Sequence, residues 1–369
     1  MRVLLAVALI AACRFSPADS SGDAGVANDG PRDGDPDAFV RPANCYGTGY
    51  TVVCPAVLPS ASYNVTTTKT ILTDVGSSAC ATLSPPNDAV CVVAGTTVTI
   101  SSFLSAHGQR PLVVLSLTTL DVPGELDVSS VTGGPGAGST GVGCTGIAPT
   151  QAGGGGYGGS FGSRGGDGGA TAPPGGVAGA ALVPAALRGG CPGGAGKDPS
   201  TFVGLGGGAV ALIAVNGISV LGTINASGSL GGAAKTGQGG GNGGGAGGMI
   251  VLDGEAITVG SSAQIFTNGG GGGGGESAIG IDGGDGSNPS STSSGGQGGN
   301  GGGLTGGKGG AGATLDAASR NPIDAVRGAD AASGSAGNGG GGGGFGVIKI
   351  FHAAMPTAAE LARFSPRPI

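Results

Sequence analysis

Glycine supplies 89 of the 369 residues, and its longest runs, such as the seven consecutive glycines at 269–275, constrain the fold more than any other feature. Glycine loses more conformational freedom on folding than any other residue, so such a run either disorders its surroundings or belongs to a loop that the fold is built to carry. The glycines follow no strict Gly-X-Y period, which argues against a collagen triple helix. Because 38% of the residues are hydrophobic, full disorder is also disfavoured. We therefore expect ordered apolar segments that alternate with glycine-rich ones.

The apolar segments share a pattern in which apolar and polar residues alternate, break at a glycine and alternate again. The pattern occurs in four copies, at residues 98–108, 120–128, 218–226 and 257–269. Apolar runs bounded by turn residues, typical of buried strands, occur at 112–117, 209–215, 249–252 and 347–351.

One copy therefore reads as strand, turn, strand, glycine bend and strand, in about 20–25 residues, which is a usual length for a solenoid coil. Stacked copies predict an all-β fold, a parallel β-solenoid over residues 96–369. A β-sandwich of short alternating strands is the alternative. The recurrent order of the parts favours the solenoid.

Three long glycine-rich insertions follow the last strand of a copy, at about 133–208, 228–248 and 269–346. Insertions at one corner of a solenoid emerge from one side, which is often its binding side. They contain near-triplet runs such as 295–300, and an extended chain with three residues per turn places every third residue on one face. The insertions therefore either pack together as a bundle or remain disordered loops.

The C-terminal segment contains a helix start signal. Thr357 and Glu360 match the capping box T-x-x-E. We expect a short helix here that covers the open end of the solenoid and protects its edge strands.

The first 13 residues, MRVLLAVALIAAC, have the features of an export signal. Arg2 precedes an apolar segment at 3–10 that is too short to span a bilayer. The residues Ile10-Ala11-Ala12-Cys13 resemble the bacterial lipobox. This resemblance implies a signal peptide at 1–12 and a mature chain that begins with an acylated Cys13. The alternative is a general secretion signal in which Cys13 is incidental.

Two further features bear on the destination of the exported chain. Arg14 rather than Asp follows the cysteine, which by analogy with enterobacterial sorting implies the outer membrane. Residues 13–44 are acidic and rich in Asp, Gly, Pro and Ser, a composition that predicts a disordered tether.

Six cysteines remain after Cys13, namely Cys45, Cys54, Cys80, Cys91, Cys144 and Cys191. An even number in an exported chain predicts disulfides. About 15 pairings are possible for six cysteines, and pairing of sequence neighbours is the simplest because short loops close most easily. Residues 45–95 then form a disulfide-bearing N-terminal β region. Zinc is disfavoured, since no C-x-x-C pair exists and His107 and His352 are far apart. We expect no metal and no cofactor.

Tyr157, Phe161 and Arg164 are bulky residues within a glycine-rich insertion. Exposed aromatic side chains can stack on sugars or on a partner surface, so these three are the candidate binding residues. The alternative is that they pack back onto the solenoid.

Charge and acidic residues limit the remaining functions. A net charge of −6 and a pI of about 4.8 disfavour nucleic acid as a partner. A carbohydrate-active solenoid enzyme, a polysaccharide lyase or hydrolase, would need clustered carboxylates. The candidates are Asp121, Glu125, Asp127, Asp253 and Glu255. Carboxylates that keep a strand face soluble explain these residues more simply.

The mature region is similar to the glycine-rich, repeat-bearing surface lipoproteins of Gram-negative bacteria. The lipobox at 10–13 and repeats such as GGGAVALIAVNGISVLGTINASG, residues 206–228, carry the similarity. It implies a lipid-anchored, surface-exposed protein of the outer membrane and no defined activity. We expect a non-enzymatic structural or adhesive protein that displays glycine-rich loops. Its expected partners are the membrane, through the lipid, and an extracellular polysaccharide or another surface protein.

Overall fold

The computed structural model describes residues 44–81, 89–132, 134–170, 174–182, 184–197, 201–235, 238–316, 319, 322–351 and 356–369. These residues belong to one compact unit, Pro42–Ile369. The predicted signal peptide, Cys13 and the tether up to residue 43 lie outside the described residues.

The described chain is nearly all β, and its main sheets are parallel, which confirms the all-β prediction. The larger sheet has eight strands, β1 (Tyr63–Val65), β3 (Cys91–Gly95), β4 (Val98–Ile100), β6 (Leu112–Ser116), β7 (Thr119–Val122), β11 (Ala209–Val220), β13 (Met249–Val259) and β17 (Val347–Phe351). Its main path is β1-β4-β7-β11-β13-β17, and the long strand β11 pairs with β6 through its first half and with β7 through its second. β3 pairs with β6 at the side of this path.

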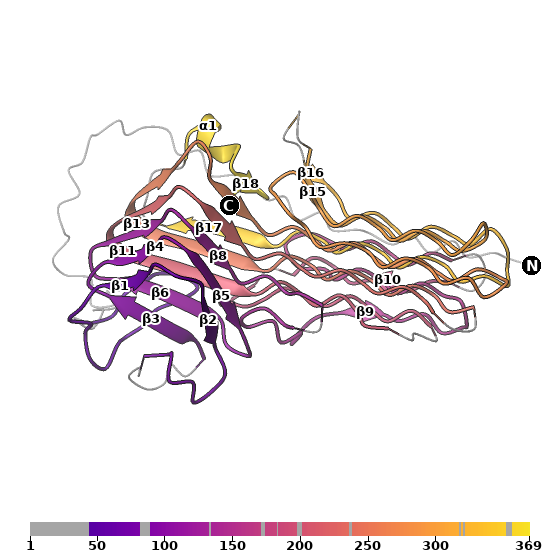
Figure 1. The fold of residues 1–369 in the computed structure, drawn as a ribbon, viewed down its shortest axis with the longest axis horizontal. Coiled ribbons are helices and arrows are strands. Elements are labelled where there is room, and N and C mark those ends of the chain that lie inside the picture. The colour runs from indigo at the N-terminus through magenta and orange to yellow at the C-terminus, as the bar shows by residue number, and fades with distance from the viewer. Residues whose placement is uncertain are drawn as a thin grey trace, which may run out of the picture. The chain divides into compact units, whose positions relative to one another are not determined.

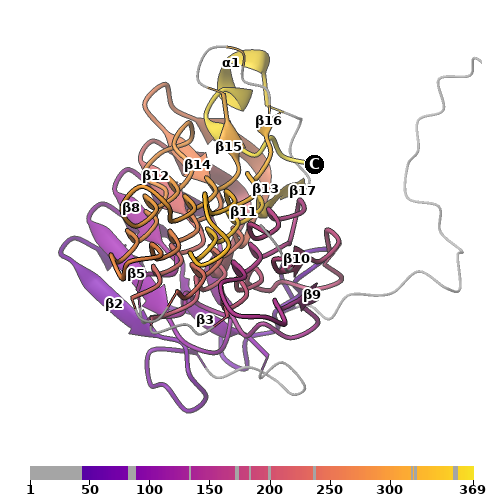
Figure 2. The ribbon, with the colours of Figure 1, turned by 90° about the vertical axis from the view of Figure 1, so that its right-hand side faces the viewer.

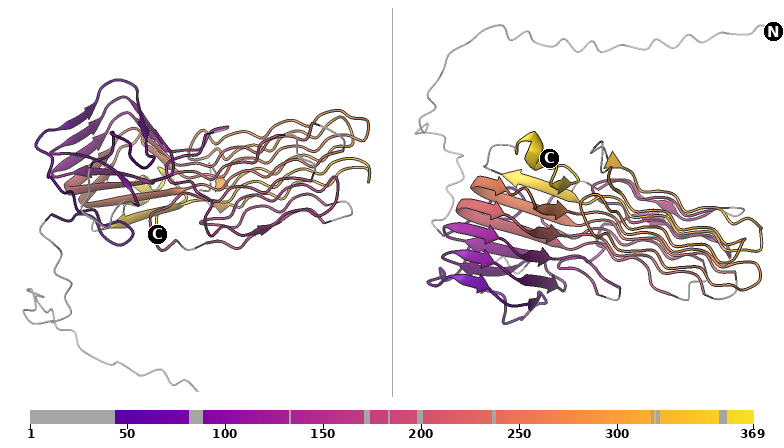
Figure 3. Two further views of the ribbon diagram at one scale, coloured as in Figure 1. Left: turned by 90° about the horizontal axis from the view of Figure 1, so that it is seen from below. Right: turned by 45° about the horizontal axis from the view of Figure 1, so that its top comes forward.

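The smaller parallel sheet has six strands, β2 (Lys69–Leu72), β5 (Phe103–His107), β8 (Glu125–Asp127), β12 (Thr223–Asn225), β14 (Gln264–Phe266) and β18 (Phe364–Ser365). Their order is β18-β14-β12-β8-β5-β2. In each repeat the chain passes from the larger sheet to the smaller one. It does so from β7 to β8 and from β11 to β12, for example. Figure 3 shows the strands of successive passes lying side by side.

The register of the strands matches the alignment expected from the repeat. Leu120 pairs with Ile218, and Ile218 pairs in turn with Ile257. In the smaller sheet Ile224 pairs with Ile265, even though the sequence copy that contains Ile265 has two extra residues. The extra residues fall in the connection between β13 and β14, so the register beyond them is unchanged.

The main core lies between the two sheets. Alternate residues of the strands, such as Leu120, Leu126 and Ile224, are fully buried there. The outer face of the larger sheet is also covered, because Val113 and Val251 pack in a second cluster with Val53 from the N-terminal segment. Strands buried on both faces need apolar residues at consecutive positions, which explains the continuous run LVVLS of β6.

The glycine-rich insertions form an ordered bundle that extends from the sheets (Figure 1). Segment 240–248 donates its N–H groups in rotation to three neighbours, residues 191–197, 338–344 and 226–232. Every third N–H therefore points to the same neighbour, which is the geometry of an extended chain with three residues per turn. Figure 2 looks along these segments, which pack side by side. Of the two possibilities for the insertions, the described residues adopt the bundle.

Glycine is required in the bundle because the backbones touch. A Cβ added at Gly243 would lie 1.7 Å from the carbonyl oxygen of Tyr157, and one at Gly158 would lie 1.8 Å from that of Gly342. The insertions also contain four short strands, which form two antiparallel pairs. These are β9 (Gly146–Ile147) with β10 (Val177–Ala178) and β15 (Thr314–Leu315) with β16 (Pro322–Ile323).

The few buried polar side chains of the bundle join neighbouring segments. The Asn242 side chain, fully buried, accepts a hydrogen bond from Gly196 N and donates to Thr201 Oγ1 and Phe202 O. Its amide therefore replaces backbone hydrogen bonds that the neighbouring segments cannot make with each other.

We predict that Asn242→Ala lowers the free energy of unfolding by about 2 kcal/mol, because it leaves buried backbone groups without partners. Chemical denaturation of the variant and the parent protein measures the difference. Asn300→Ala is the matched control, since Asn300 lies exposed in another bundle segment. Equal effects of the two substitutions would contradict the role assigned to the Asn242 amide.

Three disulfides join sequence neighbours, Cys45–Cys54, Cys80–Cys91 and Cys144–Cys191. The last one lies in the bundle, where the carbonyl of Cys191 accepts a hydrogen bond from Ala246 N. It closes the longest of the three loops.

The expected helix forms as α1 (Ala358–Leu361), and both hydrogen bonds of the Thr357–Glu360 capping box are present. However, α1 contains no buried residue, so the helix itself contributes little to the core. Four residues are too few to bury an apolar face. The residues after the helix bury apolar surface instead, because Phe364 of β18 is fully buried and Ile369 N donates to Ile348 O.

Candidate functional site

Of the three candidate binding residues, Phe161 lies where it cannot meet a partner. Its ring is fully buried and packs in the cluster on the outer face of the larger sheet, which includes Val347. The Arg188 guanidinium lies 5.5 Å from the ring centroid, and burial lowers the pKa of this guanidinium. The expectation of an exposed Phe161 is therefore wrong. The turn that carries it comes back to the sheet, where the ring covers apolar surface.

Tyr157 and Arg164 do not form a shared binding surface with Phe161. The half-buried Tyr157 ring lies between two glycines, since a Cβ added at Gly146 or at Gly194 would come within 2.3 Å of it. Arg164 is partly exposed and forms an ion pair with Asp167. The first side chain fills a space between bundle segments, and the second pairs within its own turn.

The five candidate catalytic carboxylates are divided between the two sheets. Asp121 lies on β7 and Glu255 on β13, both in the larger sheet, whereas Glu125 and Asp127 lie on β8 of the smaller one. Asp253, on β13, is 5% exposed and accepts hydrogen bonds from the N–H and the Oγ1 of Thr48, at 2.7 and 2.8 Å. Asp253 therefore holds the N-terminal segment on the sheet.

Glu125 and Asp127, two residues apart on β8, interact electrostatically. Burial raises the pKa of the Glu125 carboxyl, and the Asp127 carboxylate raises it further. The residues that pair with Glu125 on the adjacent strands are Phe103 and Thr223, and neither is an acid or a base.

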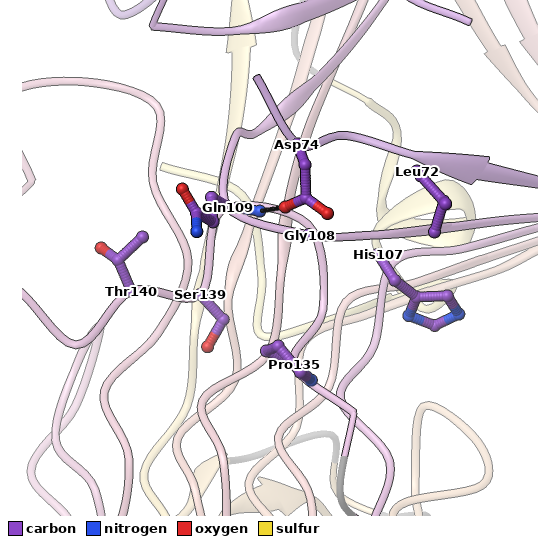
Figure 4. Close-up of a pocket in the computed structure, with 8 residues that line it drawn as sticks. All are labelled: Leu72, Asp74, His107, Gly108, Gln109, Pro135, Ser139 and Thr140. Carbon is purple, nitrogen blue, oxygen red and sulfur yellow. Dashed lines mark hydrogen bonds between the residues drawn. The ribbon is translucent and has the colours of Figure 1, made fainter. Parts of the chain in front are cut away.

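A cavity of about 570 Å³ lies where β2 and β5 end and the first glycine-rich insertion begins (Figure 4). It is lined by Leu72, Asp74, His107, Gly108, Gln109, Pro135, Ser139 and Thr140. The sequence interpretation did not identify it. The signal available there was the break at Gly108, whose φ of +131° a residue with a side chain rarely adopts.

The cavity offers hydrogen-bonding groups from three segments of the chain. Asp74 Oδ1 accepts the N–H of Gln109 at 3.0 Å, and Ser139 Oγ donates to the carbonyl of Gly206. The buried Nδ1 of His107 has no hydrogen-bond partner. In Figure 4 no hydrogen bond joins His107 to a hydroxyl group, and its ring lies apart from Gln109 and Thr140. Among the lining residues, the hydrogen bonds described join no nucleophile to a base, a contact that nucleophilic catalysis needs.

The described residues contain no group of three or more His, Cys, Asp and Glu side chains that could hold a metal ion. In the same part of the chain, no helix has the length and apolar character needed to cross a membrane. Comparison of the chain with known proteins finds no matching family model, curated protein or solved structure.

Proposed function

We propose that this protein is a non-enzymatic, lipid-anchored protein of the outer membrane and cell surface, with a structural or adhesive role. Cys13 is the anchor, residues 14–44 are the tether, and the glycine-rich bundle is displayed away from the membrane. Its contacts are with an extracellular polysaccharide or another surface protein. The lipobox-like sequence supports the location, and the hydrogen-bonded bundle supports the display role.

We further propose that the two parallel sheets are faces of one β-solenoid, in which each pass through both sheets is a coil. Val98 pairs with Leu120 and Leu104 pairs with Leu126, so one coil takes 22 residues. This length and the repeated in-register pairing support the architecture. In such a solenoid each insertion leaves from one coil and returns to the next coil in the stack. The first residues of the three insertions therefore lie beside one another, and so do their last residues.

The observation that carries the display role is the dense backbone hydrogen bonding of the bundle. Segment 269–276 donates to residues 307–313, 239–245 and 284–287, in the same rotation that segment 240–248 shows. Backbone groups that are bonded on every side hold the chain in one conformation, so little ordering entropy remains to be lost when the bundle contacts a partner. A rigid rod built from glycine also presents its terminal turns at a fixed distance from the solenoid.

We predict that wild-type cells incorporate radiolabelled palmitate into this protein and that the Cys13→Ala variant does not. For surface exposure, a protease recognition sequence inserted at Gly334, where nothing lies within 4 Å of an added Cβ, is expected to be cleaved in intact cells. A periplasmic marker protein serves as the control for envelope integrity. Absence of label, or cleavage only after the outer membrane is broken, would contradict the proposed location.

A further inference from the structure

The bundle ends in turns away from the sheets (Figure 1), and several of these turns carry exposed aliphatic side chains. Residues 277–282 and 302–305 form two of these turns, which follow the outward-running segments 269–276 and 295–301. The exposed fractions are 81% for Ile279, 48% for Ile281 and 99% for Leu304. We call these three residues the tip patch.

The two turns are in direct contact, so the tip patch is a single surface. Ala278 N donates to Thr305 Oγ1 at 3.0 Å, and a Cβ added at Gly303 would lie 3.2 Å from Ile281 Cδ1. A third turn is attached to them, because Ala332 N donates to Thr305 O at 2.9 Å. The aliphatic side chains thus lie on turns that are hydrogen-bonded to one another and not on independent loops.

Several N–H groups of these turns are already bonded within the protein. The N–H groups of Ser277 and Gly280 donate to Ile281 O and Ser277 O, and Ile281 N donates to Ser277 Oγ at 2.8 Å. Gly306 N donates to Gly302 O in the second turn. An N–H group that is bonded internally does not lose a water partner on entering an apolar medium, which lowers the cost of placing these turns at the boundary between headgroups and acyl chains.

The composition of the two turns favours a lipid surface over a protein partner. Residues 277–282 and 302–305 contain no Trp, Tyr or Arg, the residues that dominate protein–protein hot spots, where Leu is under-represented. The exposed charges beside the turns are of both signs, Asp282 and Asp285 against Lys235 and Lys308. An aliphatic patch with balanced charge suits a zwitterionic membrane surface and gains nothing from an anionic one.

We propose that the tip patch inserts into the boundary between headgroups and acyl chains of a zwitterionic lipid surface. This inference rests on the proposed display role, to which it adds a membrane facing the bundle as a further partner. The protein then attaches to two surfaces, through the lipid anchor and through the tip patch.

The test uses the full chain with Cys13→Ser, so that no acyl chain contributes, and phosphatidylcholine vesicles in a sedimentation assay. We predict that Ile279→Ser with Leu304→Ser lowers the vesicle partition coefficient at least about tenfold, because two aliphatic side chains no longer leave water. Val57→Ser with Val75→Ser is the matched control, since these side chains are 83% and 75% exposed but lie away from the tip. The apolar segment at 3–10 is common to all variants and does not affect the comparison.

A second readout locates the tip in the bilayer. The chain has no tryptophan, so Leu304→Trp introduces a single reporter, whose fluorescence brominated phosphatidylcholine should quench. Val75→Trp should not be quenched. Equal binding of the tip variant and the control variant, or an unquenched Leu304→Trp, would overturn the proposal. So would loss of self-association or of cell attachment on patch substitution without any vesicle binding, since the partner would then be a second copy or another protein. None of these outcomes affects the palmitate test of the anchor.

Discussion

Replacing Gly243 with alanine is expected to lower the free energy of unfolding by more than about 3 kcal/mol, beyond the range of ordinary overpacking. The added Cβ would lie 1.7 Å from the carbonyl oxygen of Tyr157 and 2.4 Å from its carbonyl carbon. Both are backbone atoms, so no side-chain rotation relieves the contact. Gly243 also donates to Gly194 O and accepts from Gly204 N, and any movement of the segment weakens both hydrogen bonds.

The matched control is Gly334→Ala, because nothing lies within 4 Å of a Cβ added at Gly334. It should change stability by less than about 0.5 kcal/mol, as surface substitutions usually do. Urea denaturation gives the free energies, and hydrogen exchange locates the damage. We expect faster exchange along segment 240–248 and unchanged protection in β11. If both substitutions were tolerated equally, the backbones would not be in contact as described.

The sheets could be predicted from the sequence because their side chains encode the register. Apolar residues alternate at Leu120 and Val122 and again at Ile218 and Val220, and slipping the pairing by one residue would move all of them out of the core. The pairing of Leu120 with Ile218 follows from that requirement. The disulfides and the capping box are also encoded by particular side chains.

The arrangement of the bundle could not be predicted because glycine has no side chain with which to select a neighbour. Segment 240–248 contacts residues 191–197 and 338–344, yet most of the residues in these three stretches are glycines, which do not distinguish one partner from another. The arrangement of the bundle segments is set by the sheets, because the sheets fix where every insertion starts and ends. The burial of Phe161 could not be predicted from its glycine-rich neighbours either, because the surface that buries its ring lies on strands far away in the sequence.

The cavity was missed for a related reason. His107 ends a strand, whereas Asp74 and Ser139 come from separate connections on either side of it. Their meeting depends on the parallel pairing of β2 with β5 and on the path of the first insertion. The pairing of β2 with β5 follows from a local sequence pattern, whereas the path of the first insertion does not.

Removing the Cys144–Cys191 disulfide with two alanine substitutions is expected to lower the free energy of unfolding by about 4 kcal/mol, from the chain entropy of a loop of this length. The sequence separation is 47 residues, against 9 for Cys45–Cys54. The same relation gives about 2.6 kcal/mol for the shorter loop. The paired variants Cys144→Ala with Cys191→Ala and Cys45→Ala with Cys54→Ala, compared by urea denaturation, measure both losses.

The longer loop matters more because the bundle has little apolar surface to stabilise it. Its own hydrophobic cluster contains Ala313, Leu315 and Phe345, whereas the large clusters lie at the sheets. Glycine-rich chain also gains more conformational freedom on unfolding than other sequences, so a covalent link that restricts the unfolded chain is most effective there. A larger loss from the Cys45–Cys54 variant would contradict this account, and would indicate that the N-terminal segment, held by Asp253, limits the stability of the whole unit.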